Sequence, residues 1–245
     1  MSNNNLRIPA ENSLPFKFAD ATTIGEGKDS VVDKIRAEVT ETQSGVELKD
    51  MALKEMKREE YADIDEMKKS KGYYEFLKQF PEFGKFVPET TFFVAKKTEG
   101  EKPHGYSIQK FLPGRRLFEV PKQELYENKE NLAQLLEFAK AALQVIEACE
   151  KDTNLTPDFG ASGSGFRNQI MTGLLNSPRH TTNVMLTDFP NESGKKISFV
   201  DVGIRTSARK EKPVVKQIIS ELRTYVLKKQ FERWIRELEQ RLKKF

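Results

Sequence analysis

Two polar residues that could bind a metal ion flank a pair of short apolar runs. Asn183 precedes the run at residues 184–186, and Asp201 follows the run at residues 197–200. The segment between them, residues 188–196, contains Pro, Asn, Ser and Gly and predicts the turn of a β-hairpin. Antiparallel pairing would place the amide of Asn183 beside the carboxylate of Asp201, a donor pair that suits Mg²⁺. The alternative is that both are ordinary turn residues.

Two features of the first 80 residues could bind phosphate groups, and a third could support one of them. Gly25 and Gly27 predict a turn whose backbone N–H groups could approach a phosphate closely. Lys54 lies in an apolar strand pattern, where an inward ammonium needs a partner. Glu75, at the edge of an apolar helical stripe, could reach it. The alternatives are a plain turn, a lysine in solvent and a solvated glutamate.

The elements that would position these residues form two groups, which together predict an α+β fold. Period-two and apolar patterns predict an antiparallel sheet from strands at residues 16–24, 31–39, 51–56, 86–94 and 105–111, with a loop at 40–48. Apolar stripes predict helices at 58–80, broken at 70–72, at 119–151, and from 213 to 245. The change at Pro113 and Gly114 predicts an N-terminal lobe of residues 1–113 and a C-terminal lobe of residues 114–245.

Composition excludes several classes of protein. The 245 residues include one cysteine, Cys149, and two histidines, so neither an intrachain disulfide nor a Cys- or His-based metal cluster is expected. Cys149 is predicted to be a core residue. No apolar run approaches a membrane span. The net charge is +4, and the part from Arg205 onward is rich in Lys and Arg, but Asp and Glu are interleaved with them on helices and no nucleic-acid-reading motif is present. We therefore expect a soluble, cytoplasmic protein with no membrane and no nucleic acid partner.

Taken in order, these segments resemble the protein-kinase-like fold, nearest to the small kinases of the bacterial aminoglycoside-phosphotransferase type. The segments that carry the resemblance are IGEGKDSVV, MALKEMK, YYEFLKQF, GYSIQKFLPGRRL, TTNVML and FVDVG. The resemblance implies a two-lobed fold that binds ATP and Mg²⁺ and transfers a phosphoryl group. The phosphate acceptor would be an unknown small-molecule or protein hydroxyl.

The resemblance also implies a role for each candidate residue. Gly25 and Gly27 would cover the phosphates, and Lys54 would contact the α- and β-phosphates and pair with Glu75. The segment from Gln109 to Phe111 would hold the adenine through backbone hydrogen bonds. Asn183 and Asp201 would bind Mg²⁺.

The sequence departs from this family at the catalytic base. The family places an aspartate five residues before the metal-binding asparagine, but Pro178 stands there and cannot transfer a proton. Asp158, in LTPDFG, is the best substitute as general base, and residues 161–180 would then be an insertion. If Asp158 is only a surface turn residue, the chain is a pseudokinase that binds nucleotide or a protein partner without catalysis.

Two further questions stay open at this point. Arg115, Arg205 and Arg209 could bind an anionic acceptor or could simply be solvated. Nucleotidyl transfer, with the nucleotide bound in the reverse direction, is a third hypothesis for the reaction.

Overall fold

The computed structural model places the chain in two compact units. It describes residues 8–9, 18–26, 30–42, 45–56, 63–96, 102–151, 155–156, 159, 183–200, 205–206 and 214–245. The first unit is Met1–Gly72 with Glu89–Leu112, and the second is Tyr73–Pro88 with Pro113–Phe245. Residues 73–88 thus group with the second unit, although they precede the predicted boundary between residues 113 and 114.

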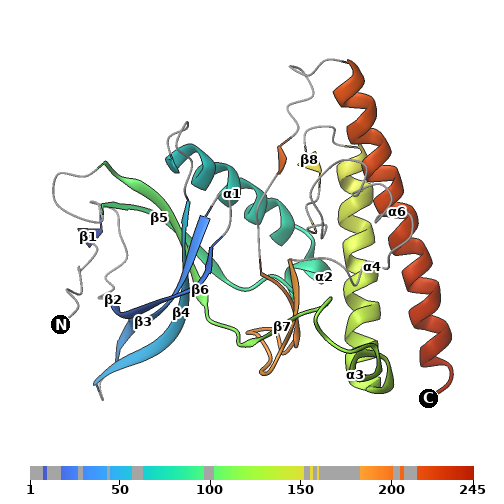
Figure 1. Cartoon of the computed structure of the whole chain (residues 1–245), viewed down its shortest axis with the longest axis horizontal. Helices are drawn as coiled ribbons and strands as arrows, with labels where there is room; N and C mark the ends of the chain where they lie inside the picture. The colour runs from blue at the N-terminus through green and yellow to red at the C-terminus, as the bar shows by residue number, and fades with distance from the viewer. Residues whose placement is uncertain are drawn as a thin grey trace. The chain divides into compact units, whose positions relative to one another are not determined.

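The first unit is built on an antiparallel sheet (Figure 1). Across the sheet the strand order is β1 (Ile8–Pro9), β5 (Thr90–Lys96), β6 (His104–Lys110), β4 (Gly45–Met56), β3 (Ser30–Thr42) and β2 (Phe18–Glu26). All five pairings are antiparallel. β2, β3 and β4 follow one another in space as in sequence, as predicted for a meander.

One face of this sheet carries the apolar core of the first unit. Successive side chains of a strand point to opposite faces. The buried residues on the core face are Ile35, Leu53, Phe93, Ala95, Tyr106 and Ile108, with Met51 packed against them. Lys54 lies between Leu53 and Glu55 in β4, so it points to the other face.

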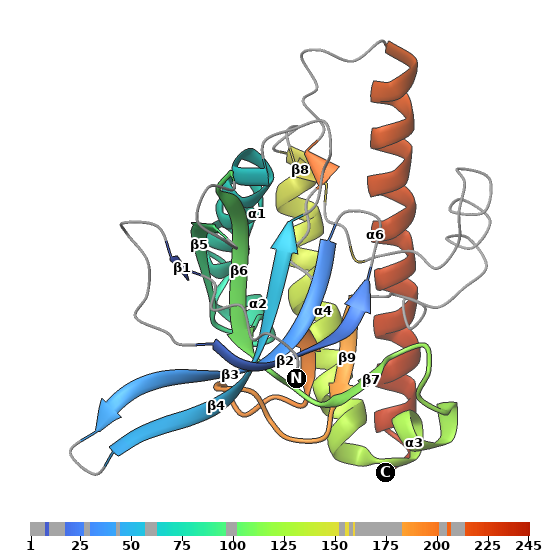
Figure 2. The same cartoon turned by 60° about the vertical axis from the view of Figure 1, so that its left-hand side comes forward.

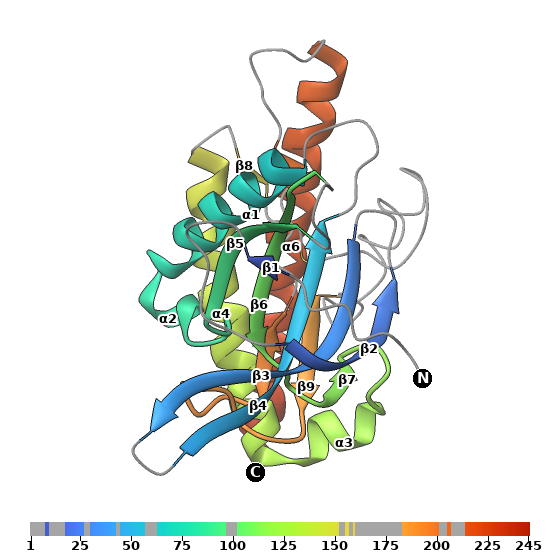
Figure 3. The same cartoon turned by 90° about the vertical axis from the view of Figure 1, so that its left-hand side faces the viewer.

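Two predictions for this sheet are wrong. Residues 40–48 were expected to form a loop, but β3 and β4 continue to Thr42 and Gly45 and pair with each other to that point. β6 pairs with β4 only as far as Met51. The ends of β3 and β4 that pair with each other therefore extend beyond the rest of the sheet (Figures 2 and 3). The turn expected from Gly25 to Gly27 does not include Gly25 and Glu26, because both are in β2; Gly27 lies outside the described residues.

The second unit is mainly helical and contains two small sheets. Its helices are α2 (Pro81–Gly84), α3 (Lys122–Glu127), α4 (Lys129–Lys151) and α6 (Val214–Leu242). One sheet has the order β10 (Ile197–Phe199), β9 (Val184–Thr187) and β7 (Gly114–Arg116), and the other pairs β11 (Arg205–Thr206) with β8 (Leu155–Thr156). The predicted end of α4 at Lys151 and the predicted hairpin strands are confirmed.

The core of the second unit lies between the hairpin and the helices α4 and α6. The two helices run side by side (Figure 1). Phe138 of α4 and Phe231, Trp234 and Leu238 of α6 are all buried in this core. Cys149 is buried in the same cluster, as predicted.

The helix α1 (Asp63–Lys78) differs from its prediction. The sequence Ser70-Lys71-Gly72 was expected to break it, but the helix is continuous through these residues. A methyl group at Gly72 would meet no atom within 4 Å, so this glycine is not required by packing. The predicted apolar stripe is confirmed, because Tyr73 and Leu77 are buried and Phe76 and Phe80 pack against the same core.

The structure is therefore a mixed α+β protein, with an antiparallel sheet in one unit and helices with smaller sheets in the other. Within the described part of the chain, no helix combines the length and the apolar character needed to span a bilayer.

Candidate functional site

The hairpin that carries Asn183 is formed as the sequence predicts. β9 and β10 pair antiparallel, with Phe199 opposite Val184. Beyond this pair, the N–H of Val200 donates to the carbonyl oxygen of Asn183 at 3.0 Å. Asn183 therefore lies directly beside the residue that precedes Asp201 in the chain. Asp201 itself is outside the described residues.

A third segment meets the same end of the hairpin. The N–H of Asn183 donates to the carbonyl oxygen of Phe159 at 3.4 Å, and Phe159 directly follows Asp158. The buried Phe159 ring lies 5.5 Å from the Phe199 ring and 5.1 Å from the Phe231 ring, measured between centroids. Asp158, like Asp201, is outside the described residues, but the residue next to each of them hydrogen-bonds to the Asn183 backbone.

The short strands β8 and β11 bring the same two segments together again. Arg205 pairs with Thr156, and Thr206 pairs with Leu155. β8 ends two residues before Asp158, and β11 begins four residues after Asp201. Backbone pairing thus flanks both aspartates in the chain. β8 pairs with β11 on one side, and Phe159 and Val200 hydrogen-bond to Asn183 on the other.

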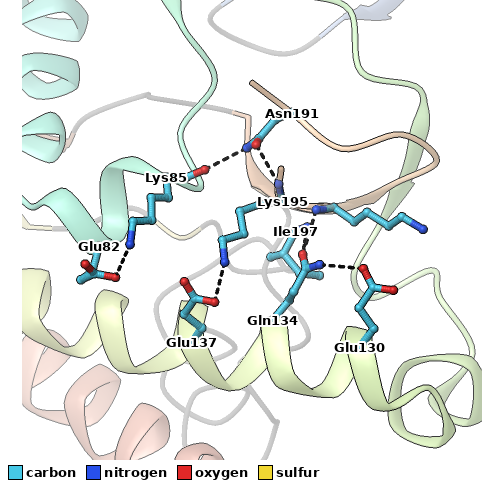
Figure 4. A network of polar contacts seen from close by, with 9 residues as sticks. Glu82, Lys85, Glu130, Gln134, Glu137, Asn191, Lys195 and Ile197 are labelled. Carbon is cyan, nitrogen blue, oxygen red and sulfur yellow. Dashed lines mark hydrogen bonds and ion pairs between the residues drawn. The ribbon is translucent and has the colours of Figure 1, made fainter. Parts of the chain in front are cut away.

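The loop of the hairpin is ordered around Asn191 (Figure 4). Its buried side-chain oxygen Oδ1 accepts hydrogen bonds from the N–H groups of Ser193, at 2.9 Å, and Lys195, at 3.0 Å. Its Nδ2 donates to the carbonyl oxygen of Lys85 at 3.0 Å. The amide thus ties the loop to itself and to the chain that follows α2.

A second buried amide, that of Gln134 on α4, ties the start of β10 to the helix. Gln134 Oε1 accepts from the N–H groups of Lys196, at 2.8 Å, and Ile197, at 3.4 Å. Beside it, Lys195 Nζ forms an ion pair with Glu137 at 2.6 Å (Figure 4). These contacts position β10, the strand that leads to Val200 and then to Asp201, the predicted metal ligand.

Both edges of the hairpin are covered. β7 pairs with β9 through Gly114, Arg115 and Arg116, and a Cβ atom on Gly114 would lie 2.6 Å from Thr187 Cα. On the other edge, the N–H of Phe199 donates to the carbonyl oxygen of Phe86 at 2.7 Å. The strand predicted at residues 86–94 is correspondingly shorter: β5 begins at Thr90, and Phe86 belongs to the hairpin's surroundings.

In the first unit, Gly25 and Lys54 lie in one row across the sheet. Gly25 pairs with Val32, and Val32 pairs with Lys54. Neighbouring strands are about 4.8 Å apart, so the two backbones are separated by about 10 Å. Lys54 is half-buried on the face opposite the apolar core. Gly27 lies outside the described residues.

The two residues predicted to face the adenine have well-defined backbone partners. Gln109 is in β6, between β4 and β5, where it pairs with Ala52 and Thr90; its Oε1 accepts from Thr90 Oγ1 at 3.3 Å. The N–H of Phe111 donates to the carbonyl oxygen of Asp50 at 3.0 Å. Phe111 could therefore offer a nucleotide its carbonyl oxygen but not its N–H.

Glu75 lies on α1 and is exposed. It belongs to the second unit, whereas Lys54 belongs to the first. The pairing of Lys54 with Glu75 stays a prediction.

Arg115, a candidate for binding an anionic acceptor, has a protein partner. Its guanidinium forms an ion pair with Glu124, and this contact raises the pKa of Arg115. Asp188 adds a smaller effect in the same direction. Arg115 is thus held by α3, while Arg209 lies outside the described residues.

The described residues contain no group of three or more His, Cys, Asp or Glu side chains that could hold a metal ion. A site made of one amide and one carboxylate needs no such group, because Mg²⁺ commonly takes only one or two protein ligands and fills its shell with water and phosphate oxygens. Asn183, which is half-buried, and Asp201, which lies outside the described residues, are the two donors that the sequence predicts.

Comparison with known proteins adds no family to these observations: no family model matches the chain, and no curated protein is similar to it in sequence. Only the chemistry and the contacts of the candidate residues therefore indicate a function. Sequence patterns missed Gln134, Asn191 and the carbonyl group of Phe159. A polar residue inside the apolar stripe of α4 was the one available signal for Gln134.

Proposed function

We propose that this protein is an ATP- and Mg²⁺-dependent phosphotransferase that acts on a small-molecule or protein hydroxyl group. The observation that carries the proposal is the meeting of three chain segments at Asn183, whose N–H and carbonyl groups bond to Phe159 and Val200. These neighbours belong to the segments of Asp158 and Asp201. Asp158 and Asp201 are each the next residue along the chain from one of these neighbours, which supports assigning both aspartates to one site with Asn183.

Each residue of the set has one role. Asn183 and Asp201 would hold Mg²⁺. When bound, this ion would neutralise part of the negative charge of the phosphates. Lys54 would contact the α- and β-phosphates, with Glu75 orienting it, and Gly25 and Gly27 would cover the phosphates with backbone N–H groups. The row that joins Gly25 to Lys54 supports this assignment.

The proposed reaction needs one base. The acceptor oxygen forms a bond to the γ-phosphorus, and the bond from that phosphorus to the β–γ bridging oxygen breaks, which releases ADP. The acceptor's proton passes to the carboxylate of Asp158. The adenine would meet the chain after β6, where Phe111 can offer its carbonyl oxygen.

One observation favours a second function. Pro178, five residues before Asn183, cannot act as a base. If Asp158 does not take over this role, the protein is a pseudokinase that binds nucleotide or a protein partner without turning ATP over.

The test is ADP release from Mg-ATP, measured with a panel of hydroxyl acceptors that includes aminoglycosides, together with the affinity for Mg-ATP. We expect Asp158→Asn to lower kcat by about 10²–10⁴-fold and to change the nucleotide affinity by less than about twofold. Asp188→Asn, which changes an exposed aspartate of the hairpin loop, is the matched control.

The outcomes separate the hypotheses. Equal turnover by the wild type and Asp158→Asn removes Asp158 from the mechanism. Binding of Mg-ATP without ADP release supports the pseudokinase. No binding of Mg-ATP overturns both.

A further inference from the structure

From Tyr225 onward, the outer side of α6 carries an exposed stripe in which Lys and Arg predominate, called the basic stripe below; one turn earlier, at Glu221, the same row is acidic. Its members follow one another at spacings of three and four positions, which places them on one face of the helix. The exposed residues of this basic stripe are Tyr225, Lys229, Arg233, Arg236 and Gln240, followed after the helix by Lys243 and Lys244. From Tyr225 to Gln240 the stripe is about 22 Å long.

The opposite side of α6 fixes which way the stripe points. Phe231, Trp234 and Leu238 are buried in the core that α6 shares with α4. The basic stripe therefore lies on the surface of the second unit. The helix cannot insert this apolar face into another partner without leaving α4.

The stripe contains no acidic residue, and acidic residues line its two edges. Glu232 and Glu239 lie along one edge and Glu237 along the other. All three are engaged: Glu232 pairs with Lys229 at 2.8 Å, Glu239 with Lys140 at 2.7 Å, and Glu237 with Arg241 at 2.9 Å. Among the described residues, Arg233 and Arg236 form no ion pair. The centre of the stripe thus presents two guanidinium groups outside any ion pair, and Glu232, which is paired with Lys229, attracts that of Arg236 from a longer distance.

We propose that this stripe binds an acidic segment of a partner protein. A guanidinium presents N–H donors in a fork that matches a carboxylate. The residues of the stripe repeat about every 5–6 Å along the helix, so a chain that carries several carboxylates can meet them in succession. This inference is independent of the phosphotransferase proposal.

The shape of the charge distribution selects this partner over other polyanions. A flat anionic membrane or a wide nucleic-acid duplex would also meet the carboxylates at the two edges, whereas a single acidic segment fits between them. Single-stranded nucleic acid is bound through exposed aromatic rings that stack on its bases. Here the ammonium of Lys229 lies over the Tyr225 ring at 5.8 Å, and the rings of Phe231 and Trp234 are buried.

The experiment uses the full chain and a fluorescently labelled oligoglutamate peptide of about eight residues, which spans the stripe at about 3.3 Å per residue. Binding is measured by anisotropy at low and at physiological salt. We expect saturable binding that weakens as salt rises. The variant Arg233→Glu with Arg236→Glu should bind at least about tenfold more weakly.

The matched control reverses two exposed lysines elsewhere in the second unit, Lys122→Glu with Lys129→Glu. It makes the same change in net charge and should bind within about twofold of the wild type. If the glutamate variant does not fold, as judged from the fluorescence of Trp234, Arg233→Ala with Arg236→Ala replaces it, with a loss of about three- to tenfold expected.

Three outcomes would overturn the proposal. One is the absence of saturable binding, and another is an equal loss in the lysine control, which would indicate a net-charge effect. The third is tighter arginine-dependent binding to an oligothymidine strand or to phosphatidylserine vesicles than to oligoglutamate.

Discussion

At the scale of single residues, the buried amide of Asn191 satisfies three backbone groups at once, those of Ser193, Lys195 and Lys85. We predict that Asn191→Leu lowers the free energy of unfolding of the second unit by about 2–3 kcal/mol, because the substitution leaves buried donors and an acceptor unpaired. Urea denaturation followed by Trp234 fluorescence measures this, since Trp234 is the only tryptophan of the chain.

The control for this prediction is a neighbour in the same loop. Glu192 is exposed, so Glu192→Ala should change the free energy by no more than about 0.5 kcal/mol. A loss below about 1 kcal/mol in Asn191→Leu would show that the loop does not depend on this amide.

Two glycines predict opposite effects of the same substitution. Gly72 is exposed inside α1, and a methyl group added there would have no atom within 4 Å, so Gly72→Ala should stabilise by about 0.5–1 kcal/mol. A Cβ atom added to Gly114 would lie 2.6 Å from Thr187 Cα, which is too close for two carbon atoms. Gly114→Ala should therefore destabilise by about 2 kcal/mol. Thermal unfolding of the two variants provides the check; equal melting temperatures would contradict both arguments.

The candidate site residues could be selected from sequence, but the contacts that hold the hairpin beside them could not. Asn183 and Asp201 stand beside apolar runs, which is a local pattern. The contact of Asn191 with Lys85 joins residues 106 positions apart, and that of Gln134 with Lys196 joins residues 62 positions apart. Such contacts arise from packing of distant elements, so no local spacing indicates them.

At the scale of elements, the sequence predicted those with several helical turns or with an apolar run next to a turn segment. The α4 stripe is an example of the first kind, and the strands β9 and β10 are examples of the second. β8 and β11 have two residues each and β7 is Gly-Arg-Arg, so none of them contains an apolar run from which a strand could be predicted. The extension of β3 and β4 was missed because its polar composition resembles a loop, and cross-strand pairing is not visible in composition.

An ion pair between two helices makes one prediction about acid stability. Lys140 of α4 hydrogen-bonds to Glu239 of α6 and thereby lowers the pKa of the Glu239 carboxyl below its ordinary value of 4.5. A carboxyl whose pKa is lower in the folded state adds stability above its unfolded pKa and loses it as the pH falls through the folded pKa. Glu239→Gln should therefore be slightly less stable at pH 7, and the difference should shrink as the pH falls below 4.5 and vanish once the carboxyl is protonated in the folded state.

Urea midpoints of the wild type and Glu239→Gln, measured from pH 7 to pH 3, give the readout. The effect should also shrink in high salt, because the pair is exposed. Glu127→Gln changes an exposed glutamate of α3 that forms no ion pair among the described residues, and it should show neither dependence. A constant difference across the pH range would assign the effect of Glu239 to packing rather than to charge.

At the scale of the whole molecule, the two units have separate apolar cores. One lies on a face of the sheet around Leu53 and Ile108, and the other surrounds Phe138 and Trp234. The candidate residues are divided in the same way: Gly25 and Lys54 belong to the first unit, and Asn183 belongs to the second. The proposed function therefore requires both units to act on one nucleotide, a condition that stability measurements can test.

Mg-ATP should stabilise the protein through both sets of residues. A ligand at a hundred times its Kd stabilises the folded state by about 2.7 kcal/mol, which corresponds to a rise in Tm of about 5–10 °C for a chain of this size. We expect Lys54→Met and Asn183→Ala each to remove most of this rise, since one takes away a phosphate contact and the other a metal ligand.

Controls in each unit separate this linkage from general destabilisation. Lys49→Met alters an exposed lysine of β4, the strand that carries Lys54, and Glu192→Ala an exposed residue of the hairpin loop; both should retain the full rise. The quantity compared is the change in Tm on adding Mg-ATP, not Tm itself, so a variant that is merely less stable still counts. If Lys54→Met responds like the wild type while Asn183→Ala does not, the nucleotide is bound by the second unit alone, and the role assigned to Lys54 is wrong. If neither variant loses the rise, the nucleotide binds elsewhere on the chain.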